Sequence, residues 1–118
     1  MDKITGDVLL LEDEAIIAID MEDALKELGA SRVVTMDTCE AALAWLSGND
    51  PVFAIVDPRL KDGYCGPVAH ILSEKRIPFI VYSGDPEGAG MEDDSFQNGI
   101  WLLKPSMPED IVKAIERA

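Results

Sequence analysis

The chain has 118 residues, 47% of them hydrophobic and 28% charged, which predicts one globular domain spanning residues 1–118. Its 23 acidic and 10 basic residues give a net charge of −13, and a field of that sign repels nucleic-acid phosphates and anionic lipid. No apolar run approaches the roughly 18 residues of a membrane span, and no secretory signal opens the chain. We therefore expect a cytoplasmic protein that binds neither nucleic acid nor membrane.

The two cysteines, Cys39 and Cys65, are too few for a disulfide framework or a zinc site. The single histidine, His70, adds no ligand cluster. We expect both cysteines to be inert thiols and His70 to have a structural role within a helix.

Predicted strands and helices alternate in the first part of the chain. The apolar run Val8–Leu11 predicts a strand, and apolar residues spaced by three and four over 17–28 predict an amphipathic helix. Gly29 is placed to end that helix as its C′ residue. Residues 32–36 read as a second, shorter strand.

The alternation continues beyond the second strand. Asp37 or Thr38 is placed to cap a helix that ends at about Leu46, before a break rich in turn-forming residues. The apolar run 52–56 predicts a third strand, and a turn-rich loop separates it from a helix over about 68–72.

The last third begins with a fourth strand over 78–82 and contains a fifth over 100–103. A capping box, in which Ser106 is followed three positions later by Glu109, predicts the start of a closing helix. Continuous apolar strands separated by helices indicate an α/β protein with a doubly wound parallel sheet covered on both faces.

The segment between the fourth and fifth strands breaks this regularity. Four of the chain's nine glycines lie from Gly84 to Gly99, and only Met91 and Phe96 within it are suited to face a core. Because glycine disfavours helix, we expect an irregular or short fourth helix here.

Polar residues follow several of the predicted strands, and ligands of an open parallel sheet bind just beyond the carboxyl ends of its strands. These strand-end residues are Glu12 and Asp13, Asp57, Ser83 and Lys104. Three carboxylates within a few ångströms repel one another by about several kcal/mol at an effective dielectric near 20. A hard divalent cation relieves that repulsion, and Mg²⁺ prefers a few carboxylates together with water and phosphate oxygen.

A carboxylate can also act as the nucleophile of phosphoryl transfer, and Asp57 fits that role by charge. A phosphoryl group brings about −2, while Mg²⁺ and Lys104 bring +3 against −2 from Glu12 and Asp13. The phosphorylated site would carry about −1 with the metal and about −3 without it. The sequence therefore predicts phosphorylation that requires Mg²⁺.

With these residues in place, the whole chain resembles a receiver domain of the two-component response-regulator family. The matching features are the acidic pair Glu12-Asp13, then Asp57, Ser83-Gly84 and Lys104-Pro105, each after a predicted strand. The stretches 62–69 and 77–84 also resemble a subgroup of stand-alone receivers that accompany alphaproteobacterial stress and light signalling kinases. The resemblance implies a five-stranded, flavodoxin-like sheet with strand order 2-1-3-4-5.

The resemblance also implies roles for single residues. Asp57 would accept phosphate, and Glu12, Asp13 and Asp57 would bind Mg²⁺ together with the backbone carbonyl of Arg59. The Ser83 hydroxyl would hydrogen-bond one phosphoryl oxygen.

Two further residues complete the implied site. Lys104 would pair with another phosphoryl oxygen. Trp101 occupies the position of a switch residue, where the family usually has tyrosine or phenylalanine.

The implied partners are a histidine kinase or phosphotransfer protein and a downstream protein. The chain would catalyse only its own phosphorylation and dephosphorylation, and we expect a monomer or a weak dimer.

Three alternatives remain open at this point. A degenerate receiver would bind partners without ever being phosphorylated. A haloacid-dehalogenase-type phosphatase also uses an aspartate nucleophile, but it requires a second aspartate, two positions further on, as the general acid. This chain has Arg59 at that position. A flavin-binding, flavodoxin-like module needs a phosphate loop rich in Ser, Thr and Gly, where this chain has residues 12–14, which are all acidic.

Overall fold

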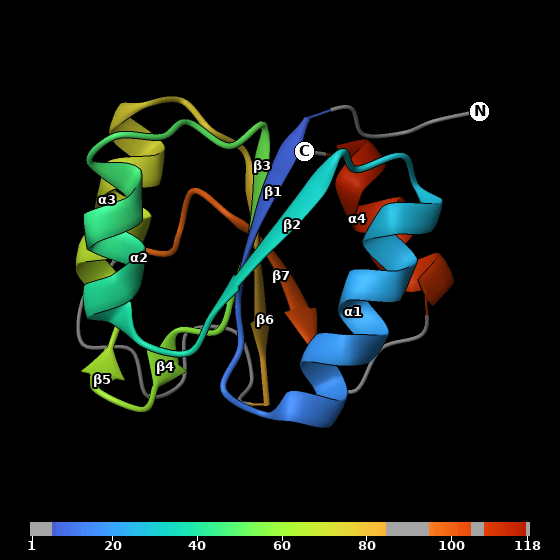
Figure 1. Ribbon diagram of the computed structural model, residues 1–118, viewed down its shortest axis with the longest axis horizontal. Coiled ribbons are helices and arrows are strands. Elements are labelled where there is room, and N and C mark those ends of the chain that lie inside the picture. The colour runs from blue at the N-terminus through green and yellow to red at the C-terminus, as the bar shows by residue number, and fades with distance from the viewer. Residues whose placement is uncertain (1–5, 85–94, 105–107, 118) are drawn as a thin grey trace.

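A five-stranded parallel sheet runs through the middle of the protein (Figure 1). The computed structural model describes residues 6–84, 95–104 and 108–117. The strands of this sheet are β1 (Asp7–Leu11), β2 (Arg32–Met36), β3 (Phe53–Val56), β6 (Phe79–Ser83) and β7 (Ile100–Leu103). Their order is β2-β1-β3-β6-β7, which confirms the predicted flavodoxin-like arrangement.

Helices cover both faces of the sheet (Figure 1). They are α1 (Ala15–Glu27), α2 (Cys39–Leu46), α3 (Gly66–Glu74) and α4 (Pro108–Arg117). Helices α2 and α3 lie on one face, and α1 and α4 lie on the other. Over the described ranges, no helix combines the length and the apolar character that crossing a bilayer would require.

The two covered faces explain why the central strands β1 and β3 are almost wholly apolar, whereas the edge strand β2 carries the exposed Arg32 and Thr35. In β1, Leu9 and Leu11 belong to the core beneath α2 and α3, while Val8 and Leu10 belong to the core beneath α1 and α4. Since neighbouring residues of a strand point to opposite faces, the middle of a strand covered on both sides offers few positions to a polar residue, and the polar residues Asp7, Arg32 and Ser83 stand at strand ends.

Helix ends follow the local sequence. The Thr38 hydroxyl accepts a hydrogen bond of 3.2 Å from the Ala41 amide and caps α2. Gly29, just after α1, has a φ of +101°, a conformation that residues with a side chain rarely adopt. The predicted capping residue Ser106 of the closing helix lies outside the described residues.

A small hairpin after β3 was not predicted. It pairs β4 (Arg59–Leu60) with β5 (Gly63–Tyr64) in antiparallel fashion, and residues 61–62 form its turn. The sequence analysis read this stretch only as a turn-rich loop. Strands of two residues show no periodicity that a sequence pattern could reveal.

The two cysteines correct the sequence analysis, which expected inert thiols. Cys39 and Cys65 form a disulfide, with Cα atoms 5.5 Å apart and a sequence separation of 26. Cys39 begins α2 and Cys65 immediately precedes α3. Both helices cover the same face of the sheet and start at the same edge, so the fold brings together two residues that lie far apart in the chain.

The irregular segment before β7 is described only in part, because residues 85–94, including Met91, lie outside the described ranges. Residues 95–98 form a turn, in which the Gly99 amide donates to the Phe96 carbonyl. The side chain of Phe96 is fully buried, as predicted, and its ring contacts Tyr64 edge-on at 5.7 Å between centroids.

Candidate functional site

The parallel register places two of the strand-end carboxylates side by side. Leu11 of β1 is level with Val56 of β3, so Glu12 and Asp57 leave the sheet at the same height on neighbouring strands. The Asp57 amide continues the ladder by donating to the Leu11 carbonyl at 3.0 Å. Asp13 follows one position later and joins the same edge.

Three carboxylates gather at this edge. Glu12, Asp13 and Asp57 each present an oxygen within 4.8 Å of the others. Their exposure differs, since Glu12 is buried, Asp57 is partly buried and Asp13 is the least buried. Repulsion among the carboxylates is therefore strongest on the buried side, where water screens least.

Lys104 supplies a positive charge to this cluster. Its Nζ lies 2.8 Å from Glu12 Oε1 and 2.8 Å from Asp57 Oδ2, and only 13% of the lysine side chain is exposed. The residue reaches the site because it directly follows β7, where its amide donates to the Ser83 carbonyl at 2.7 Å. One ammonium faces three carboxylates, so the four groups together carry −3 + 1 = −2.

Backbone amides hold the remaining carboxylate oxygens in place. The Glu14 amide donates to Glu12 Oε2 at 3.1 Å, and the Arg59 amide donates to Asp57 Oδ1 at 3.0 Å. The guanidinium of Arg59 lies over the Tyr64 ring, 5.4 Å from its centroid. The carboxylates of Glu12 and Asp57 are thus oriented before any ligand arrives.

Burial and the shared ammonium shift two pKa values. Burial raises the pKa of Glu12 above its ordinary 4.5, and the hydrogen bond from Lys104 opposes this only in part. Burial on its own would lower the pKa of Lys104, but hydrogen bonds and charges from Asp57 and Glu12 outweigh burial and raise it above 10.5. Lys104 therefore stays charged, whereas ionising the buried Glu12 carboxyl costs free energy.

Ser83 and Trp101 lie on the neighbouring strands β6 and β7. Ser83 ends β6, is buried, and is level with Leu103 of the neighbouring strand. Trp101 is level with Val81 and is half-buried against the core beneath α2 and α3. Ser83 therefore stands on the strand next to β3, and Trp101 stands one strand further from the carboxylate cluster.

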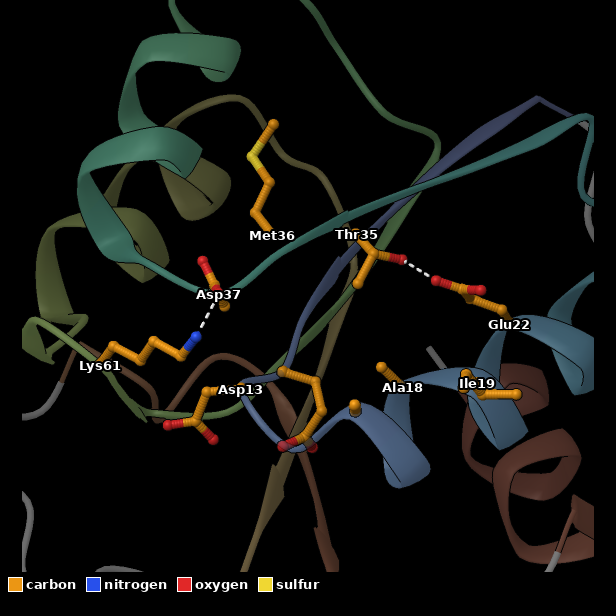
Figure 2. Close-up of a pocket in the computed structure, with 10 residues that line it drawn as sticks. Asp13, Ala18, Ile19, Glu22, Thr35, Met36, Asp37 and Lys61 are labelled. Atoms are coloured by element: carbon orange, nitrogen blue, oxygen red, sulfur yellow. Dashed lines mark hydrogen bonds and ion pairs between the residues drawn. The ribbon is translucent and has the colours of Figure 1, made fainter.

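A second charged pair beside the cluster was missed by the sequence analysis. Lys61 Nζ, in the hairpin turn, lies 2.7 Å from Asp37 Oδ2, and Figure 2 shows the pair facing Asp13 across a pocket of about 420 Å³. The hydrogen bond and the charge of Asp37 raise the pKa of Lys61, and Asp13 adds to this. The signal was available, because Asp37 follows β2 at the same edge of the sheet.

The donor set of the cluster fits a small hard cation. Two oxygen ligands of one octahedral Mg²⁺ lie about 3 to 4 Å apart, because each Mg–O bond is about 2 Å long. The three carboxylate oxygens of Glu12, Asp13 and Asp57 lie within 4.8 Å of one another, so side-chain movements that shorten these separations by at most about 1 to 2 Å would meet this requirement. Their residual charge of −2, after Lys104 is counted, matches one divalent ion.

Replacing Asp13 by asparagine tests the repulsion directly. In EDTA we expect the Asp13→Asn variant to be about 1 kcal/mol more stable than the wild type, because a pair of charges 4.8 Å apart interacts by roughly 3 kcal/mol at a dielectric of 20 and water screens this exposed member. Mg²⁺ should raise the melting temperature of the variant less than that of the wild type. Thermal unfolding with EDTA or MgCl₂ measures both.

Asp23→Asn is the matched control, since Asp23 is exposed on α1, away from the cluster. It should leave the Mg²⁺ response unchanged. Equal responses of the Asp13 variant and the wild type would exclude Asp13 from the metal site.

The raised pKa of Glu12 predicts a pH-dependent effect. A folded-state pKa above the unfolded value means that the ionised carboxylate lowers stability above the folded pKa, and that this penalty disappears as the pH falls through the folded pKa to 4.5. Glu12→Gln mimics the protonated acid. In EDTA it should therefore be more stable than the wild type at pH 7, with a difference that shrinks towards pH 4.5. Urea unfolding at both pH values measures this, and a difference independent of pH would contradict it.

Comparison with solved structures identifies the fold and the family. SdrG from Sphingomonas melonis Fr1 is 32% identical, covers 98% of this chain and 97% of its own length, and superposes with a TM-score of 0.79. A response regulator receiver protein from Sinorhizobium medicae WSM419 is 25% identical over 96% of this chain and 93% of its own, with a TM-score of 0.78. The receiver domain of the sensor histidine kinase PA1611 from Pseudomonas aeruginosa PAO1, described with magnesium in its active-site cleft, is 20% identical over 97% of each chain, with a TM-score of 0.80.

No protein-family model and no curated protein matches the sequence. These solved structures nevertheless superpose on nearly the full chain, and SdrG is 32% identical over 98% of it. The protein belongs to the response-regulator receiver domains, which are signalling modules rather than conventional enzymes.

Proposed function

We propose that this protein is a phosphorylation-controlled signalling module in which Asp57 accepts a phosphoryl group from a phosphohistidine of a histidine kinase or phosphotransfer protein. The observation that carries the proposal is the pairing of Lys104 with both Glu12 and Asp57, 2.8 Å from each, inside a cluster that keeps a charge of −2. An ion pair that served stability alone would be balanced. The residual charge of −2 matches one divalent cation.

The transfer step uses groups that are already in place. A carboxylate oxygen of Asp57 attacks phosphorus and forms a P–O bond, while the P–N bond of the phosphohistidine breaks and its imidazole, already protonated at the other ring nitrogen, leaves as the neutral base. Lys104 then exchanges a carboxylate partner for a phosphoryl oxygen. Ser83 donates its hydroxyl hydrogen to another phosphoryl oxygen.

Glu12, Asp13, Asp57 and the carbonyl of Arg59 would hold the Mg²⁺. Bound there, Mg²⁺ would neutralise and orient the phosphoryl oxygens. Glu12 is fixed for this role by the Glu14 amide, and Asp57 by the Arg59 amide. Charges fixed in advance need little reorganisation during the reaction, which favours transfer.

The signal would leave the domain through protein contacts. Movement of Ser83 towards the phosphoryl group would make room beneath it, and the half-buried Trp101 stands on the neighbouring strand where it can respond. We propose that the partner upstream is a cytoplasmic kinase or phosphotransfer protein, and that the downstream target is a protein that distinguishes the two states. The receiver neighbours, one of them part of a sensor histidine kinase, support this class of partner.

Incubation with acetyl phosphate tests the proposal without a known kinase. The intact mass of the wild type should rise by one phosphoryl group in MgCl₂ and should stay unchanged in EDTA. Asp57→Asn should abolish the increase, and Asp23→Asn, on the exposed side of α1, should keep it. Circular dichroism checks that every variant is folded.

An unchanged mass of the folded wild type in MgCl₂ would exclude phosphorylation by this donor and favour a degenerate receiver that signals by binding alone. Turnover of small phosphoesters would instead indicate a phosphatase. We expect none, because Arg59 stands where the general acid of such enzymes would be.

A further inference from the structure

The Cys39–Cys65 disulfide closes on the segment that follows the phosphoacceptor. Cys65 ends this segment, and its amide donates to the Pro58 carbonyl at 2.8 Å, one residue after Asp57. The β4–β5 hairpin lies between these two points. The disulfide joins this hairpin covalently to the first residue of α2, at a Cα separation of 5.5 Å that unstrained disulfides commonly have.

Non-covalent contacts hold the same two elements together. The Asp62 carboxylate of the hairpin turn accepts hydrogen bonds from the Cys39 amide at 2.7 Å and from the Glu40 amide at 3.0 Å, at the start of α2. Lys61 pairs with Asp37 beside them. We call these two stretches, residues 37–40 and 61–65, the hairpin junction. The disulfide is its only covalent link within the described residues.

The hairpin junction can also accommodate two thiols. The Gly63 carbonyl oxygen lies 3.6 Å from Cys39 Sγ and 3.9 Å from Cys65 Sγ. After reduction it could accept an S–H hydrogen bond from either cysteine. The contacts of Asp62 and Lys61 do not depend on the disulfide, so reduction should loosen the hairpin junction without unfolding the domain.

The role of this disulfide depends on the cellular compartment, which is inferred here from the proposed function. Histidine kinases draw phosphate from ATP in the cytosol, where glutathione and thioredoxin keep most thiols reduced. Disulfides that occur there are mostly transient and redox-sensing. In such a compartment, a disulfide next to the phosphoacceptor segment is therefore expected to form and break reversibly rather than to be permanent.

We propose that Cys39 and Cys65 form a thiol–disulfide exchange site for low-molecular-weight thiols of the glutathione class, and that its redox state sets how firmly the segment after Asp57 is held. Both cysteines are buried, Cys39 at 8% exposed and Cys65 at 0%, so attack requires a local opening of the hairpin junction and falls on Cys39 Sγ, the less buried of the two residues.

The exchange balances in two steps. A glutathione thiolate bonds to Cys39 Sγ, the Cys39–Cys65 bond breaks, and Cys65 leaves as a thiolate that takes up a proton. A second glutathione thiolate then attacks the mixed disulfide, releases Cys39 as a thiolate that is protonated in turn, and forms glutathione disulfide. Two electrons pass from two glutathiones to the protein, and glutathione disulfide drives the reverse reaction.

The first measurement asks whether the exchange occurs in the folded chain. Wild-type protein is equilibrated at different ratios of reduced to oxidised glutathione, quenched with acid and alkylated, and its intact mass is recorded. We expect both cysteines to become alkylated together as the ratio rises and to be protected again when it falls. A disulfide that resists every ratio, or one that does not re-form, would overturn the proposal.

The second measurement asks whether the link controls the segment after Asp57. Hydrogen–deuterium exchange of residues 58–65 should be faster in the dithiol than in the disulfide form, while β1 should not change. Phosphoryl uptake from acetyl phosphate in MgCl₂ should be about fivefold slower in the dithiol, the size of a modest coupling between two sites. Equal exchange and equal uptake in both forms would overturn the proposal.

Cys39→Ser is the matched variant, since a serine hydroxyl is tolerated at the start of a helix and cannot form the link. It should behave like the dithiol at every glutathione ratio, and a remaining redox response would contradict the assignment. The two proposals fail separately. If neither redox form takes up phosphate while residues 58–65 still respond to glutathione, the phosphorylation proposal fails and the redox proposal stands.

Discussion

Replacing Lys104 by methionine is expected to lower the free energy of unfolding in EDTA by about 3 kcal/mol. The lysine is the only cation within hydrogen-bond distance of Glu12 and Asp57 in the described part of the site, and the Glu12 side chain is just 1% exposed. Removing one partner of a buried pair leaves the other charged and unsolvated, which typically costs about 3 to 5 kcal/mol. Urea unfolding in EDTA measures the loss.

The same substitution should slow phosphoryl uptake from acetyl phosphate by about 100-fold even with MgCl₂, because the phosphoryl oxygens lose a donor fixed in advance. Lys113→Met, on the exposed side of α4, is the matched control and should change stability by less than about 0.5 kcal/mol.

The double variant Glu12→Gln/Lys104→Met separates an unpaired charge from poor packing. With Glu12 neutralised, most of the lost stability should return, since removing both partners of a buried pair is far less costly than removing one. If the double variant were as unstable as Lys104→Met alone, the loss would come from packing rather than from the unpaired buried charge of Glu12.

Truncating Phe96 to alanine is expected to cost about 4 kcal/mol of stability, the typical value for removing a fully buried aromatic side chain. Phe96 lies in the turn before β7 and contacts Tyr64 of the hairpin edge-on. The substitution therefore leaves a cavity between two segments that flank the site. Urea unfolding measures the cost.

Gln97→Ala is the control for this prediction, because Gln97 is exposed on the same turn and should change stability by less than about 0.5 kcal/mol. A loss below about 1 kcal/mol for Phe96→Ala would show that the turn collapses around the smaller side chain. The Phe96 side chain would then contribute little to holding β7 in place.

The sequence predicted the sheet because its strands carry an unusually clear signal. Uninterrupted apolar runs such as 8–11 and 53–56 are typical of strands buried on both faces, and the polar residue that ends each run marks the edge where it leaves the core. Glu12, Asp57 and Lys104 could be placed together from this rule alone, and the structure brings them within 2.8 Å contacts. Their chemical roles remain proposals.

The missed features depend on tertiary structure that no local pattern encodes. The Cys39–Cys65 disulfide requires two helix starts to be adjacent, which follows only when the strand order and the helix faces are both known. The hairpin is too short to show periodicity. Asp62 lies in the stretch that was expected only to be a turn-rich loop, but its carboxylate caps α2 from another element, a role that needs coordinates to recognise.

The site is divided along the chain in a way that bears on its biosynthesis. All of its acids come from residues 12–57, whereas the cation that balances the buried ones arrives only with Lys104, after the last strand. A nascent chain that has emerged only as far as β3 thus holds an uncompensated anionic edge, and its amino-terminal half gains little from folding early. Compensation of the buried acids is therefore complete only once β7 has joined the sheet and brought Lys104 to them.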